Sequence, residues 1–220
     1  ELIRALGKPI AAPSANLFGY TRPTSAAHVA EDLGAGVDLI LDGGPCAVGV
    51  ESTVLKIEKD EGIILRPGGV SAEELSKFIR VRKDGADPGK KQESPGMLDS
   101  HYAPWTKFIL LPTEFTEFAS EFEASLQESQ SMRSEPLRVG LLAFQKIPEN
   151  SSFESVQVLS EKGDLVEAAS KVFQTMRDLD KMHLDWILAE PVPSSGIGLA
   201  ILDRLRKASG GKIAKKGFLH

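Results

Sequence analysis

The pattern of apolar and polar positions divides the chain into two blocks of different regularity. In the second block, four short apolar runs predict strands, at 107–111, 137–144, 156–159 and 186–189. Apolar residues spaced three and four apart predict three helices, over 113–130, 165–176 and 199–208. Strands that alternate with helices in this way are typical of a parallel sheet covered on both faces. We therefore expect a small three-layer parallel α/β domain over residues 105–220.

The first block, residues 1–80, predicts a less regular mixture of helices and strands. Helices are predicted over 1–6, 26–33 and 72–79. Strands are predicted over 9–12, 38–42, 51–57 and 63–66. Two of the helices carry a start signal, because Ser25 precedes an alanine-rich segment and Ser71 stands three residues before Glu74. The first helical pattern begins without a capping residue, and we therefore expect an N-terminal part of the protein to be missing from this sequence.

Residues 81–104 lie between the blocks and begin with the composition of a linker. The part up to Glu93 is charged, contains glycine and proline, and has no apolar periodicity. The stretch 94–104 differs, because it has two prolines and adds apolar and aromatic side chains, including Tyr102. Composition alone favours a domain-boundary loop. The more specific interpretation is that this stretch is a strap that covers a site on the preceding block.

Composition narrows the class of protein but does not identify it. The 220 residues are 41% hydrophobic and 26% charged, with a net charge of −5, values that are ordinary for a globular protein and do not suggest wholesale nucleic-acid binding. The single cysteine, Cys46, excludes an internal disulfide and a multi-cysteine zinc site, and it suits a reducing compartment. No apolar run is long enough to span a bilayer, and we expect a cytoplasmic protein.

Four polar residues at the ends of predicted strands are candidates for ligand binding. Ser14 and Asn16 follow a strand in a proline-containing turn, where they could hold phosphate oxygens or only satisfy the local backbone. Ser52 follows a glycine-rich approach that would admit a ligand, but it could equally be a strand residue facing water. Arg66 ends an apolar strand before Pro-Gly-Gly, a place that suits a clamp on phosphate or carboxylate; a surface ion pair is the common alternative.

Several familiar catalytic signatures are absent from the sequence. There is no phosphate-binding loop with lysine. There is also no Gly-x-Ser-x-Gly elbow, so a serine hydrolase is disfavoured. No His, Cys and carboxylate cluster has transition-metal spacing. The segment Gly196-Ile-Gly198 resembles half of a dinucleotide fingerprint, which is a weak signal that close helix–strand packing explains equally well.

A set of short motifs resembles the YrdC-type threonylcarbamoyl-AMP synthases in their two-domain form. The matching stretches are 11–16, 42–44, 49–53, 64–69, 94–97 with 101–104, and 198–205. The resemblance implies an α/β fold in which residues 1–80 are the C-terminal half of a YrdC-like twisted-sheet α/β catalytic domain. Residues 81–104 would be the interdomain linker or strap, and residues 105–220 a small Rossmann-like three-layer parallel α/β domain.

The resemblance also implies an activity and a set of binding residues. Enzymes of this family are nucleotidyltransferases that convert L-threonine, bicarbonate or CO2, and ATP into threonylcarbamoyl-AMP and pyrophosphate. A downstream tRNA threonylcarbamoyl transferase then uses the product to modify adenosine in tRNA. Mg2+ would accompany ATP, and no catalytic residue is assigned. The implied ATP-binding residues are Ser14, Asn16, Arg22, Arg66 and Tyr102, and the implied L-threonine-binding residues are Ala12 and Ser52.

One departure from the family and two alternatives remain open at this point. The family's Lys-x-Arg motif has no counterpart here, so we expect this 220-residue chain to be inactive, or nearly so, by itself. The first alternative is a nucleotide- or double-stranded-RNA-binding module without catalysis, supported only by the basic tail over 203–220. The second is a purely structural or regulatory role for the C-terminal domain.

Overall fold

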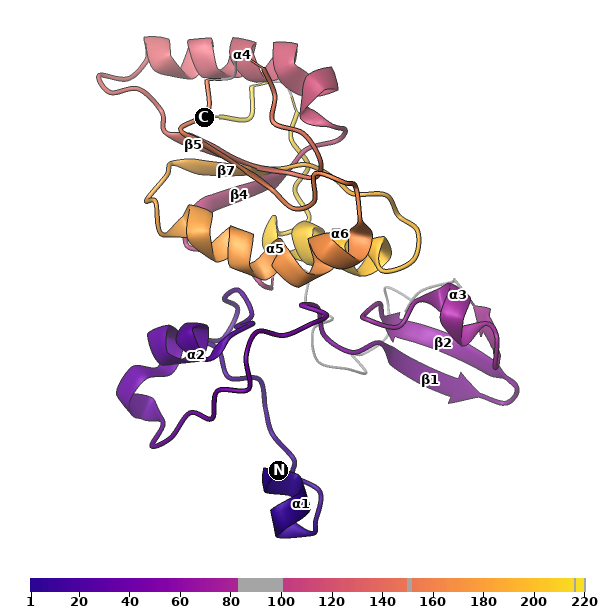
Figure 1. The fold of residues 1–220 in the computed structure, drawn as a ribbon. Coiled ribbons are helices and arrows are strands. Elements are labelled where there is room, and N and C mark those ends of the chain that lie inside the picture. The colour runs from indigo at the N-terminus through magenta and orange to yellow at the C-terminus, as the bar shows by residue number, and fades with distance from the viewer. Residues whose placement is uncertain (83–100, 150–151, 216, 220) are drawn as a thin grey trace.

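The structure is a computed structural model that describes residues 1–82, 101–149, 152–215 and 217–219 (Figure 1). The first seven residues of the expected strap, 94–100, therefore lie outside the described residues, and only 101–104 can be placed. None of the described helices is long and apolar enough to cross a membrane.

The second block forms a four-stranded parallel sheet between two layers of helices (Figure 1). Its strands are β4 (Lys107–Leu110), β5 (Val139–Ala143), β6 (Ser155–Val158) and β7 (Trp186–Ala189), in the spatial order β4-β7-β5-β6. Helix α4 (Phe115–Ser131) covers one face, and helices α5 (Leu165–Asp180) and α6 (Gly198–Ala208) cover the other. The predicted three-layer parallel α/β domain is confirmed.

The two central strands of this sheet, β5 and β7, are covered on both faces, and this explains why they read as continuous apolar runs. In β5, Leu142 packs into the cluster under α5 and α6, whereas its neighbours Leu141 and Ala143 pack into the cluster under α4. All three side chains are fully buried. A strand covered on only one face would have alternated apolar with polar residues.

The first block contains a small mixed sheet and three short α-helices. The helices are α1 (Leu2–Leu6), α2 (Ala26–Leu33) and α3 (Ala72–Leu75), with a 3-10 turn, η1, at Gly34–Gly36. Strands β1 (Val54–Glu58) and β2 (Glu61–Arg66) form an antiparallel hairpin, and β3 (Arg80–Arg82) pairs with β2 in parallel. The predicted capping is confirmed, since Ser25 accepts the His28 N–H and Ser71 forms a capping box with Glu74.

Four of the predicted elements in the first block are wrong or have the wrong bounds. Residues 9–12 and 38–42 form no strand; they are largely exposed, and none of the described strands lies beside them to supply ladder hydrogen bonds. The helix predicted over 72–79 ends at Leu75, and β3, which was not predicted, begins at Arg80. Strand β1 begins at Val54, three residues later than predicted.

The first block has hardly any core of its own among the described residues. Val50 is its only member of the two large core clusters, and Phe18 and Phe78 are each 89% exposed. Other large apolar side chains that stay exposed in this block include Leu2, Ile3, Leu6, Leu39, Leu41 and Ile57. Its position therefore depends strongly on polar contacts with the second block.

A buried ion pair joins the two blocks through α2 and α5. The guanidinium of Arg177 on α5 donates to both carboxylate oxygens of Asp32 on α2, with Nη1 to Oδ1 at 2.8 Å, and it also donates to the Thr21 carbonyl at 2.9 Å. The side chains of Arg177 and Asp32 are only 1% and 4% exposed. One turn along α5, Asp180 accepts the Tyr20 hydroxyl at 2.8 Å. These contacts fix the loop that precedes α2 against the second block.

Removing one charge of this buried pair should destabilise the protein strongly. Replacing Asp32→Asn keeps the shape but leaves the buried Arg177 charge without its counterion, so the free energy of unfolding should fall by about 3 kcal/mol in urea denaturation. Lys181→Ala is the control, because it breaks the exposed Lys181–Glu31 pair at 2.7 Å and should cost less than about 1 kcal/mol. Equal losses in the two variants would contradict this assignment.

Candidate functional site

Three of the predicted binding residues meet in the loop that leads to α2. The Nη1 of Arg22 donates hydrogen bonds to the Ser14 hydroxyl and to the Asn16 side-chain oxygen. The Asn16 amide in turn donates to the Leu17 carbonyl at 2.6 Å. The turn therefore presents a guanidinium, a hydroxyl and an amide within one small, partly exposed group.

A single carboxylate joins this group to the second block. Glu51 accepts the Nε of Arg22 at 3.2 Å through one oxygen and the Nε of Arg204 at 2.9 Å through the other. Burial would raise the pKa of Glu51, but the charge of Arg204 and further hydrogen bonds outweigh it and lower that pKa to about 2. Glu51 is therefore ionised at neutral pH and holds two arginines from distant parts of the chain.

Tyr102 lies close to the same two arginines. The guanidinium carbons of Arg22 and Arg204 are 5.2 Å and 5.4 Å from the centre of its ring, and its ring packs against Phe173 at 5.6 Å. The side chain is fully buried, and its backbone has a positive φ of 67°. Burial, followed by the negative charge of Glu51, raises the pKa of the Tyr102 phenol. The aromatic residue of the expected strap is thus packed beside Arg22.

Two more of the predicted binding residues, Arg66 and Ser52, contact each other, and Ser52 directly follows Glu51 in the chain. Arg66, at the end of β2, donates its Nη2 to the Ser52 carbonyl at 2.9 Å and lies 3.5 Å from the Ser52 hydroxyl. The backbone passes very close here, because a Cβ on Gly68 would stand 2.3 Å from the carbonyl carbon of Ser52. Glycine at this position lets the turn after β2 lie directly against the Ser52 backbone.

Ala12 is the one predicted binding residue that the structure does not place in contact with another predicted binding residue. It lies in an exposed stretch, and no hydrogen bond among the described residues joins it to Ser52. Sequence reasoning also assigned no role to Glu51 or Arg204, although both stand inside the quoted motifs. Their pairing could not be found from spacing, since they are 153 positions apart in the chain.

The charges of the assembled group favour an anionic ligand. Arg22, Arg66 and Arg204 supply three guanidiniums to this group, and carboxylates come from Glu51, which accepts from Arg22 and Arg204, and from Asp203, which accepts the Nη1 of Arg204 at 2.8 Å. Guanidiniums with neighbouring hydroxyl and amide groups are well suited to phosphate oxygens. No group of three or more His, Cys, Asp or Glu that could hold a metal ion occurs among the described residues.

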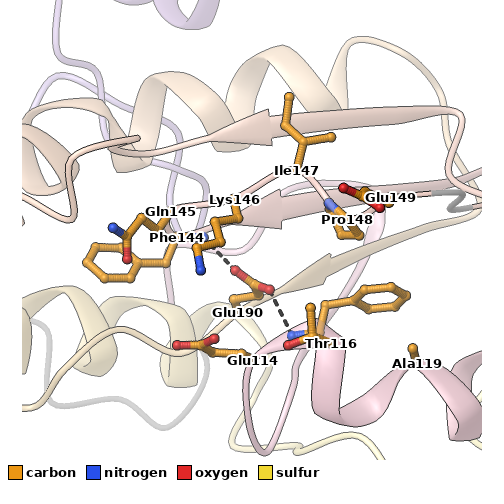
Figure 2. Close-up of a pocket in the computed structure, with 11 residues that line it drawn as sticks. Glu114, Thr116, Ala119, Phe144, Gln145, Lys146, Ile147, Pro148, Glu149 and Glu190 are labelled. Carbon is orange, nitrogen blue, oxygen red and sulfur yellow. Dashed lines mark hydrogen bonds between the residues drawn. The ribbon is translucent and has the colours of Figure 1, made fainter.

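A separate cavity of about 490 Å³ opens at the carboxyl ends of the parallel strands (Figure 2). Such crevices bind ligands in many open α/β sheets. Here the buried carboxyl of Glu190 accepts the backbone N–H of Phe115 at 2.8 Å and that of Phe144 at 2.7 Å, and burial raises its pKa. These bonds give Glu190 a structural task, which is to tie the first residue of α4 to the end of β5.

Two sequence families match the chain in succession. The family described as "Threonylcarbamoyl-AMP synthase, C-terminal domain" matches residues 70–210, and the family described as "Telomere recombination" matches residues 1–68. The chain is also similar to full-length curated proteins named threonylcarbamoyl-AMP synthase. The one from Bacillus subtilis (strain 168) is 39% identical over 97% of this chain, and the one from Pyrococcus abyssi is 37% identical over 98%.

Solved structures give the same result for the fold. The crystal structure of P. abyssi Sua5 complexed with L-threonine superposes with a TM-score of 0.80 and 36% identity, covering 96% of this chain. A variant of that protein with two alanine substitutions superposes with a TM-score of 0.78 and 34% identity. The chain spans 61% of the length of the B. subtilis relative and 62% of that from P. abyssi.

The lowered pKa of Glu51 predicts a pH-dependent contribution to stability. A carboxyl whose pKa falls from 4.5 to about 2 on folding stabilises the protein by roughly 3 kcal/mol above pH 4.5, and this contribution is lost as the pH falls towards 2. Glu51→Gln should therefore be less stable than the unsubstituted chain at pH 7 in urea denaturation. The difference between the two should shrink steadily below pH 4.5; a difference that is independent of pH would refute the assignment.

Proposed function

We propose, since the chain belongs to the Sua5/YrdC family of threonylcarbamoyl-AMP synthases, that its protein makes threonylcarbamoyl-AMP from L-threonine, bicarbonate or CO2, and ATP. In this reaction the threonine nitrogen first takes up the one-carbon unit as a carbamate. A carbamate oxygen then bonds to the α-phosphorus of ATP. At the same time the bond between the α-phosphorus and the oxygen that bridges it to the β-phosphorus breaks, and pyrophosphate leaves with that oxygen. The protein is thus proposed to be a nucleotidyltransferase.

The observation that supports this proposal is the arrangement of two groups of side chains on either side of Glu51. One group is Arg22 with Ser14 and Asn16, and the other is Arg66 with Ser52. Arg22, with Ser14 and Asn16, would hold the phosphates of ATP, and Arg66 would do so from the end of β2. Transfer to phosphorus depends mainly on positioned donors and cations, and it requires no protein nucleophile. Tyr102 would then close the nucleotide site from the strap.

Threonine is proposed to bind beside the nucleotide. Ser52 is an exposed residue whose hydroxyl lies 3.5 Å from Arg66, and with the backbone at Ala12 it would contact the amino acid. The P. abyssi protein with a similar fold was crystallised with L-threonine, which supports threonine as the substrate.

Mg2+ would reach the site together with ATP. Glu51 is already engaged by two arginines, so the metal would be held mainly by phosphate oxygens and water. We further propose that the protein acts in the cytoplasm, where a tRNA threonylcarbamoyl transferase would consume the product to modify tRNA. The RNA-binding alternative is not favoured, because relatives named as synthases match nearly the whole chain.

Calorimetric titration with ATP·Mg2+ and with L-threonine tests the proposal. We would titrate this chain and a chimera that adds the part of the B. subtilis relative that the chain does not match. We expect both ligands to bind the chimera and to bind this chain alone weakly or not at all. Arg66→Ala should weaken ATP binding about 10- to 100-fold through loss of charge-assisted hydrogen bonds, and Ser52→Ala should weaken threonine binding.

The control variant for these titrations is Arg138→Ala. Arg138 is 45% exposed and pairs with Glu154 in the second block, so its loss should leave both affinities unchanged. A folded chimera that binds neither ligand would refute the synthase proposal and would bring the RNA-binding module back into consideration.

A further inference from the structure

Arg204 has an unusual position for an arginine on a helix of the second block. It lies on α6 between Leu202 and Leu205, which are core residues, and its own side chain is 0% exposed. Burying a guanidinium is costly unless its donors are satisfied by well-placed acceptors. In this protein, two of the acceptors for Arg204 belong to the first block: the carboxylate of Glu51 and the carbonyl of Pro67.

The planar guanidinium of Arg204 donates hydrogen bonds to two separate places in the first block. Its Nε donates to Glu51 at 2.9 Å, and its Nη1 donates to the carbonyl of Pro67 at 2.7 Å. Glu51 directly precedes Ser52 in the chain, and Pro67 directly follows Arg66, so both hydrogen bonds lie beside the contact between Arg66 and Ser52. A lysine could keep the charge but has no fork with which to make both bonds.

The hydrogen-bond chain continues from Glu51 to the predicted phosphate-binding turn. The second oxygen of Glu51 holds Arg22 at 3.2 Å, and Arg22 holds Ser14 and Asn16. The Tyr102 ring lies close to both guanidiniums. Each member therefore restrains the next, from a helix of the second block to the turn at residues 14–22.

We propose that Arg204 is a positioning residue for the nucleotide, acting through Glu51 and Arg22 on the phosphate-binding turn. The inference rests on the proposed function for its ligand, ATP, and it makes α6 of the C-terminal domain a working part of that site. It differs from a purely structural role, in which Arg204 would only attach one domain to the other. Under the positioning role, the effect of Arg204 on ATP binding depends on Arg22.

The first test needs no ligand and uses this chain. Arg204→Lys keeps the charge and removes the fork, so the backbone amides of residues 14–22 should exchange with deuterium about tenfold faster than in the unsubstituted chain. Arg206→Lys is the matched control, because Arg206 lies on the same helix with an exposed side chain and should leave this exchange unchanged. Melting temperatures verify that each variant is folded, and Glu51→Gln provides a second variant that breaks the same chain of contacts.

The second test is a double-substitution cycle on ATP·Mg2+ affinity in the chimera described above. We expect Arg204→Lys to weaken binding about tenfold when Arg22 is present, and less than about twofold when Arg22→Lys has already been made. Arg206→Lys should change neither affinity. Independent, additive effects of the two substitutions would indicate domain attachment alone and would overturn the inference.

The two tests separate this inference from the proposed function. A chimera without the Arg204 or Arg22 substitutions that binds no ATP contradicts the proposed function, and the exchange measurement still decides whether Arg204 restrains residues 14–22. Unchanged exchange in folded Arg204→Lys and Glu51→Gln variants overturns the positioning role, whether or not ATP binds.

Discussion

The Glu51 carboxylate is the contact on which the arrangement of the candidate site depends. One oxygen accepts a hydrogen bond from Arg22 of the N-terminal block and the other accepts one from Arg204 on α6, and the ring of Tyr102 lies close to both guanidiniums. Without this carboxylate, two cations and a buried phenol would face one another with no negative charge between them. The carboxylate therefore sets the spacing of the cationic groups before any ligand arrives.

The two blocks are joined mainly by polar contacts from buried side chains. Arg177 and Arg204, on neighbouring helices α5 and α6, both project from the second block and are almost completely shielded from water. The backbone also approaches closely at Gly49, where a Cβ would stand 2.1 Å from the Ala169 carbonyl oxygen of α5. Because the first block adds only Val50 to the large core clusters, these directional contacts determine where its loops lie.

This division of tasks gives the second block a part in the proposed site, although that block has no obvious catalytic group. The second block has a continuous apolar core and holds α5 and α6 rigidly. The first block provides the hydroxyls, the amide and two of the arginines, and apart from Arg66, which ends β2, it carries them outside its helices and strands. A rigid scaffold that fixes flexible binding loops is a common arrangement in proteins. The buried arginines provide that connection here.

The sequence alone determined the elements whose signals are local, and the tertiary structure decided the rest. Periodicity and capping located α2, α6, β4, β6 and β7 to within a residue at each end, and the motifs indicated the family. Residues 9–12 and 38–42 have strand-like sequence but form no strand, because a strand also needs a neighbour to pair with. Likewise, Glu51 and Arg204 are ordinary charged residues in the sequence. Only folding, which brings together positions 153 residues apart, turns them into a buried pair.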